Sequence, residues 1–167
     1  MKRVLFIFTA VIIGLSMSAQ IQNTLLGFTL GHTPKSDVYN KYKSDIFFTE
    51  KEDGSICTSD VIFAGHEWDM VIFEFVDNKL SSVIFSDIET QTPAKSIEST
   101  WKSLKDKLWN KYSGYYEKTT YDMILYSDDT NKLVLLLSDS SGCLILMLQY
   151  VNTALTLQKM RAEEDEL

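Results

Sequence analysis

The most regular hydrophobic pattern in this 167-residue chain lies between residues 93 and 112. Large apolar side chains recur there at intervals of four, three, four and four residues, at Ile97, Trp101, Leu104, Leu108 and Tyr112. This spacing follows the 3.6-residue period of an α-helix and places all five side chains on one face. The pattern predicts a helix that buries this face in a core, with Trp109 beside the stripe and partly exposed.

Two further helices are predicted. The first begins at Pro34, since proline is favoured in the first turn of a helix and Thr33 before it is a suitable N-cap. Its apolar face is formed by Val38, Tyr39 and Tyr42. The last helix covers 153–167, after a cap at Asn152 or Thr153, and ends in an acidic tail.

Short apolar runs between turn-forming clusters predict strands. We expect three strands after the first helix, at 56–64, 68–76 and 79–87, and three after the second, at 118–127, 131–138 and 142–151. A further strand is expected near 24–30. The turn signals between the strands are short, as in antiparallel neighbours: "GHE", "DNK", "SDDTN" and "DSSG".

The chain also contains an internal similarity. The segment "TPKSDVYNKYKS" from Thr33 matches "TPAKSIESTWKS" from Thr92, and later matches pair Thr58 with Thr120 and Val71 with Leu133. The offsets are 59, 62 and 62 residues, and a rival alignment of "WDMVIF" with "YDMILY" has an offset of 53.

This similarity predicts an α+β fold of two tandem α-β-β-β units, about 33–91 and 92–151, within a single domain of residues 20–167. The strands form an antiparallel sheet, and the helices pack on one of its faces.

Two of the predicted strands are apolar on both sides. Residues 133–137 and 143–148 are unbroken apolar runs, whereas a sheet with one wet face alternates apolar and polar residues. The second face of this part of the sheet therefore needs a cover. The C-terminal helix, a second copy of the chain in a homodimer, or an unknown protein partner would supply one.

The N-terminus predicts export. Lys2 and Arg3 precede the apolar run Val4–Leu15, and small residues lead to a cleavage site between Ala19 and Gln20, which is typical of a signal peptide of residues 1–19. Loss of the two cations takes the net charge from −7 to −9. We expect a periplasmic or secreted protein with no nucleic-acid partner and no membrane insertion of the mature chain.

The stretch "AGHEWDM", residues 64–70, combines a histidine, two carboxylate residues and a tryptophan, and it is the densest cluster of functional side chains in the sequence. It lacks the spacing of a zinc-binding H-E-x-x-H helix, and the chain has one other histidine, His32. We therefore predict no metal, cofactor or catalytic site here, but an exposed turn. His66, Glu67 and Trp68, together with Trp109, are candidate partner contacts.

The remaining chemistry is sparse. The sequence carries no Gly-rich phosphate loop and no C-x-x-C motif. Cys57 and Cys143 are an even pair that an oxidising compartment permits to form a disulfide, although both also fit as free core residues. A non-catalytic binding module is favoured over an enzyme, and the alternative is a secreted or periplasmic hydrolase that uses carboxylates.

Short motifs support the same interpretation. Phe63 with Gly65, and Phe73, Phe75 and residues 77–80 in "F-x-F-x-D-N-K-L", resemble a group of small exported bacterial proteins. The "SAQ" cleavage site is similar to those of exported Bacteroidetes proteins. The predicted architecture resembles the beta-lactamase-inhibitor-protein-like fold. This resemblance implies protein binding without catalysis and assigns no functional residue.

Overall fold

The computed structural model describes residues 20–90, 92–120, 122–140 and 142–165. The predicted signal peptide of residues 1–19 lies outside the described residues, as do the last two positions of the predicted C-terminal helix. None of the described helices is both long and apolar enough to cross a membrane.

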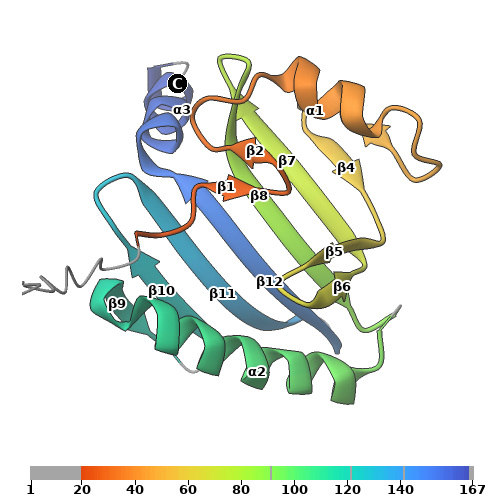
Figure 1. Ribbon diagram of the computed structural model, residues 1–167, viewed down its shortest axis with the longest axis vertical. Coiled ribbons are helices and arrows are strands. Elements are labelled where there is room, and N and C mark those ends of the chain that lie inside the picture. Colours follow the sequence, from red (N-terminus) through yellow and green to blue (C-terminus); the bar gives the residue numbers. More distant parts are fainter. Residues whose placement is uncertain (1–19, 91, 121, 141, 166–167) are drawn as a thin grey trace, which may run out of the picture.

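An eight-stranded antiparallel sheet forms the body of the molecule (Figure 1). Its strand order is β3-β4-β7-β8-β12-β11-β10-β9, so the last strand of each half of the chain, β8 and β12, lie side by side at its centre. The bounds are β3 Thr49–Glu50, β4 Ile56–Thr58, β7 Met70–Val76, β8 Lys79–Ile88, β9 Tyr116–Thr119, β10 Met123–Ser127, β11 Asn131–Ser140 and β12 Cys143–Asn152. The predicted α+β class with a large antiparallel sheet is confirmed.

Three helices accompany this sheet, at α1 Lys35–Tyr42, α2 Ala94–Tyr112 and α3 Thr153–Asp165. All three were predicted. Helices α1 and α2 pack on the same face of the sheet, against β4 and β12, and α3 lies at a corner beside β7 and β12 (Figure 1). The α2 stripe faces the core as its spacing required, since Ile97, Leu104, Leu108 and Tyr112 are buried.

The cap of α1 differs from the prediction. Pro34 is the cap residue, and the Thr33 hydroxyl instead accepts a hydrogen bond from the backbone N–H of Thr29 at 2.8 Å. Thr33 is thus used by the turn that precedes the helix. That turn follows a small hairpin of β1 Thr24–Leu25 and β2 Phe28–Thr29, which takes the place of the single strand expected near 24–30.

The strand count also differs. Four strands of the large sheet follow each of α1 and α2, so the predicted α-β-β-β order has one strand too few per helix. The run 118–127 is divided between β9 and β10. The run 56–64 is divided at Asp60, whose φ of 56° turns the chain out of the sheet. The pattern of apolar residues in the sequence does not indicate either of these two breaks.

The chain that leaves the sheet at Asp60 forms a separate hairpin of β5 Val61–Phe63 and β6 His66–Trp68. Its turn consists of Ala64 and Gly65, with φ values of 56° and 76°. Two consecutive left-handed residues make the tight turn that suits antiparallel strands, and glycine adopts this conformation without steric cost. The predicted "GHE" turn therefore ends at Gly65, and His66 and Glu67 belong to a strand.

The hydrophobic core lies between the sheet and the layer of α1, α2 and the small hairpins. Inward residues of the central strands are fully buried there, among them Val71, Phe73, Val83, Phe85, Leu133, Leu135, Leu146 and Leu148. This packing leaves the other side of the sheet without a helical layer. The consequence is a broad open face.

Candidate binding surface

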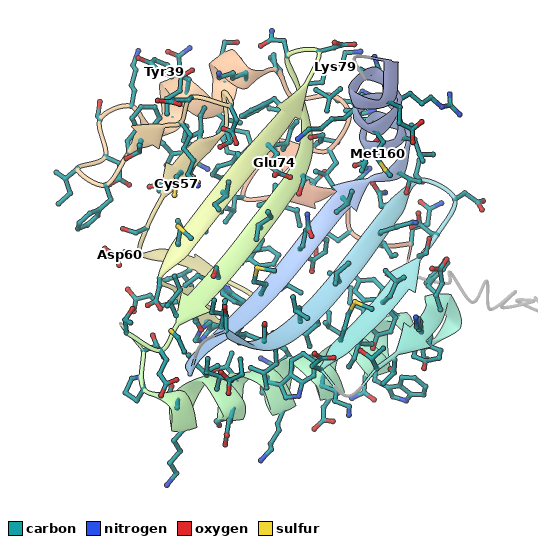
Figure 2. All side chains as sticks on the ribbon, turned by 180° about the vertical axis from the view of Figure 1, so that it is seen from behind. Tyr39, Cys57, Asp60, Glu74, Lys79 and Met160 are labelled. Carbon is teal, nitrogen blue, oxygen red and sulfur yellow. The ribbon has the colours of Figure 1, made fainter. Side chains whose placement is uncertain are left out.

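The open face consists of the outward-pointing residues of β7, β8, β12, β11 and β10. Figure 2 views the molecule from this side, and no described helix crosses the central strands. Residues that alternate with the buried core positions point toward the viewer. Helix α3 reaches only the corner next to β7, so the predicted cover from the C-terminal helix is partial.

The strand register aligns these outward residues in rows across the sheet. One row joins Met70, Ser86, Met147, Leu136 and Met123. The next row joins Cys57, Ile72, Ile84, Gln149, Val134 and Leu125. Eight of these eleven residues are large and apolar, and the other three are Ser86, Cys57 and Gln149. Ser86 is buried, and the other ten are only partly buried by their neighbours.

Polar residues border the apolar rows. The row nearest α3 joins Glu74, Ser82, Val151, Lys132 and Ser127. Within the face, the Gln149 side chain donates a hydrogen bond to the Ser82 hydroxyl at 3.0 Å. An apolar centre with a polar rim is the common anatomy of a protein–protein interface.

The unbroken apolar runs of β11 and β12 are explained by this arrangement. Leu133, Leu135, Leu146 and Leu148 point into the core and are completely buried. Their neighbours in sequence point to the open face and stay partly exposed, namely Val134, Leu136, Ile145 and Met147. The second face that the sequence predicted to need a cover is therefore the open face of the sheet.

The size of the face is sufficient for a stable contact. Five strands that lie about 4.8 Å apart give a width of about 24 Å, and about six residues at about 3.3 Å each give a length of about 20 Å. The flat area is therefore about 480 Å², without the additional area of the side chains. A flat partner would bury about 1,000 Å² in total, the lower limit for a specific protein interface.

A polar network joins the β5–β6 hairpin to the sheet on the opposite, helical side. The His66 Nε2 lies 2.6 Å from Oδ2 of Asp87, and the backbone N–H of Asp69 donates to Asp87 Oδ1 at 3.2 Å. Asp69 in turn accepts hydrogen bonds from the backbone N–H of Ile88 and the hydroxyl of Thr92. His66, predicted as part of an exposed turn, thus fastens the hairpin onto β8.

Burial raises the pKa of the Asp87 carboxyl, and the hydrogen bonds from His66 and Asp69 offset only part of this effect. The folded state therefore holds the Asp87 proton more tightly than the unfolded chain. The contribution of this group to stability is greatest below its ordinary pKa of 3.8 and is lost as the pH rises through the raised value.

We predict that wild-type protein loses stability relative to Asp87→Asn, which cannot titrate, as the pH rises from about 3 to about 7. The free energy of unfolding from urea titrations at matched pH values measures this difference. If the wild type instead gains stability relative to the variant over this range, the Asp87 carboxylate is held ionised and its pKa is lowered.

The other candidate contacts from the same motif differ in exposure. Trp68 is completely buried and donates from Nε1 to the carbonyl of Phe63 at 3.2 Å, so it is a core residue and the predicted partner contact is wrong. Glu67 is exposed on β6. His66, Glu67 and Trp68 are consecutive residues of one strand, so their side chains alternate between its two faces. This alternation explains why Glu67 is exposed whereas His66 and Trp68 are partly or fully buried.

Trp109 is 52% exposed on α2, as its place beside the helical stripe predicted. Its ring packs edge-on against Tyr116, with centroids 5.6 Å apart. This site lies on the helical side of the molecule and is separate from the open sheet face. The structure therefore does not bring the four candidate contact residues together into one surface.

The two cysteines are free. Cys57 is on β4, three strands from β12 in the sheet order, and its row meets β12 at Gln149, six residues from Cys143. Three strand spacings of about 4.8 Å and six residues of about 3.3 Å place their Cα atoms far beyond the 7 Å limit for a disulfide. The candidate disulfide is therefore incompatible with this fold.

No group of three or more His, Cys, Asp or Glu side chains among the described residues is arranged to hold a metal ion. No protein-family model, curated protein or solved structure matches this chain.

Sequence analysis did not name the residues of the open face on β7 and β8. Their signal was weak but present: Met70 and Ile72 alternate with the buried Val71 and Phe73, so both sides of β7 are apolar. In the first half of the chain, residues 80–85 alternate in part between apolar and polar side chains, so the signal for a second face that needs a cover was weaker there than at 133–137 and 143–148.

Proposed function

We propose that this chain is an exported, non-catalytic binding module that holds a protein partner on the open face of its sheet. The observation that carries the proposal is the row of Ile72, Ile84, Gln149 and Val134, in which three apolar side chains and one glutamine lie at the centre of a face without a helical layer. Full burial of an exposed side chain of this size contributes about 1.5–3 kcal/mol, and these partly buried side chains gain the part of it that corresponds to their remaining exposed area. A partner that covers several of them gains a substantial binding free energy.

The proposed setting is the periplasm or the cell exterior, after removal of residues 1–19. Support for an interaction role also comes from the proposed tandem organisation. In this proposal, helix α1 with β3, β4, β7 and β8 forms one unit and helix α2 with β9–β12 forms the other. Strands β8 and β12 are neighbours in the sheet. The proposed likeness to the beta-lactamase-inhibitor-protein-like fold rests on the sequence, and it implies protein binding.

The alternative is a hydrolase that uses carboxylates, and Asp69 and Asp87 are two neighbouring carboxylates on the helical side of the sheet. A catalytic carboxylate must be free to contact a substrate. Asp87 is fully buried and binds His66 and the Asp69 backbone, whereas the Asp69 carboxylate binds Ile88 and Thr92. Both groups are engaged in holding the hairpin and the start of α2, which supports a structural role.

The proposal is tested with the mature chain, residues 20–167, as bait in envelope extract of its native host. We expect Ile84→Lys and Val134→Lys each to reduce capture of a specific partner at least tenfold, because a lysine at the centre of an apolar contact loses well over 1.4 kcal/mol. Asn110→Lys adds the same charge on the exposed side of α2 and is the matched control.

Light scattering on the purified chain separates the two kinds of partner. A homodimer that becomes monomeric in Val134→Lys identifies a second copy as the occupant of the face, and a wild-type monomer leaves the face to a different protein. Equal capture by the wild type and both lysine variants, with all chains folded by circular dichroism, contradicts the proposal.

A further inference from the structure

A cavity on the helical side lies between α2, β12 and the β5–β6 hairpin. Figure 1 shows the hairpin and α2 on this same side of the sheet. The cavity has a volume of about 470 Å³. Its walls are mainly apolar and aromatic: Phe63, Leu104, Leu108, Tyr112, Leu148 and Tyr150.

These walls are held by the core. Phe63 stacks on Phe85 with ring centroids 4.3 Å apart and an interplanar angle of 11°. Phe63 also packs edge-on against Tyr150 at 5.9 Å, and Leu148 is fully buried. The cavity is therefore a preformed hollow of the fold, as binding sites for small molecules usually are.

Two lysines from consecutive turns of α2 line this apolar cavity. The Lys107 Nζ donates to the carbonyl of Ala64 in the hairpin turn at 3.4 Å, and the Lys111 Nζ donates to Gln22 Oε1 at 3.4 Å. Neither lysine takes part in the ion pairs of the described residues, Lys35–Glu50 and His66–Asp87. In a chain with a net charge of −7, two cations without a carboxylate partner mark this cavity as attractive to an anion.

A second hollow of about 210 Å³ adjoins the first, and Ala64, Leu104 and Lys107 line both. Its character is polar. The additional lining includes His66 and the α2 residues Ser99, Thr100 and Ser103. Lys107 thus stands between an apolar compartment and a compartment rich in hydroxyl groups.

We propose that this groove binds an amphipathic anion, with its aliphatic chain in the larger cavity and its anionic head beside Lys107 in the polar hollow. Lysine ammonium and serine or threonine hydroxyl groups all donate hydrogen bonds to an anionic oxygen. The apolar walls remove the aliphatic chain from water. An alkyl carboxylate is the simplest ligand of this class, and an alkyl phosphate presents the same chemistry.

The test is isothermal titration calorimetry of the mature chain with decanoate below its micellar concentration. We expect decanoate to bind and Lys107→Met to weaken it at least tenfold, since the methionine keeps the length of the side chain but removes the charge-assisted hydrogen bond. Lys102→Met removes the same charge from an exposed position of α2 outside both hollows, and it should leave the affinity unchanged.

Decanol and decyltrimethylammonium have the same chain without the negative charge, and they should bind at least tenfold more weakly than decanoate. Decyl phosphate distinguishes the two anionic heads: tighter binding with the same dependence on Lys107 assigns the site to a phosphate. The proposal is overturned if decanoate does not bind, if decanol binds equally well, or if Lys102→Met weakens decanoate as much as Lys107→Met.

This outcome is independent of the proposed function, because the groove and the open sheet face lie on opposite sides of the sheet. Ile84→Lys should bind decanoate like the wild type. A variant that loses partner capture but still binds decanoate is altered at the open sheet face only. A variant that loses decanoate binding but still captures the partner is altered at the groove only.

Discussion

Replacing Trp68 with alanine is expected to lower the free energy of unfolding by about 3–5 kcal/mol. Trp68 is completely buried between the hairpin and the sheet, where its ring packs on Phe85 with centroids 5.6 Å apart and against His66 at 4.9 Å. Its removal leaves a large cavity and takes away the hydrogen bond that its Nε1 donates to the carbonyl of Phe63. Chemical denaturation of the mature chain measures the effect.

The matched control is Trp109→Ala, which removes the same side chain from a half-exposed position on α2. Its cost should be about 1 kcal/mol or less, because little of the ring is lost from the core. Equal costs for the two variants would mean that the β5–β6 hairpin is not packed on the sheet as described.

The second large effect is expected at Asp128, in the turn between β10 and β11. Its carboxylate accepts three backbone hydrogen bonds, from Ile21 at 2.8 Å, Thr130 at 2.8 Å and Asn131 at 2.7 Å. Asp128→Ala leaves these donors without their partner, and we expect a loss of about 2–4 kcal/mol. The predicted "SDDTN" turn therefore also fastens the start of the described chain to the sheet, through the hydrogen bond from Ile21.

Asp129→Ala is the control for this prediction. Asp129 is the next residue, is exposed and forms no hydrogen bond with its side chain among the described residues, so its removal should change stability by about 0.5 kcal/mol or less. Thermal unfolding of both variants at neutral pH gives the comparison. Similar melting temperatures for the two variants would contradict the assigned role of Asp128.

The helices and the class of the fold could be predicted because their signals are local. The regular spacing from Ile97 to Tyr112 and the prolines at positions 34 and 93 define α1 and α2 within a residue or two. The breaks in the strands could not be predicted in this way. The β5–β6 hairpin depends on left-handed backbone at Asp60 and Ala64, residue types that adopt it less readily than glycine.

The candidate site was predicted in part for the same reason. The apolar runs at 133–137 and 143–148 indicated a second face that needs a cover, and alternation along β11 and β12 then identifies its residues. The burial of Trp68 and His66 depends on which residues of the sheet pack against them, namely Phe85 and Asp87. The partner of His66 is Asp87, 21 positions away in the sequence, and no local pattern indicates that contact.

Site-specific photocrosslinking in the native host tests whether the open sheet face is the proposed binding surface. A benzophenone side chain placed at Ile84 or Val134 probes the centre of the face, and one at Asn110 probes the exposed side of α2. We expect a discrete crosslinked protein adduct from both sheet positions and none from Asn110. An adduct from Asn110 alone, or none from either sheet position in a folded and exported chain, would contradict it.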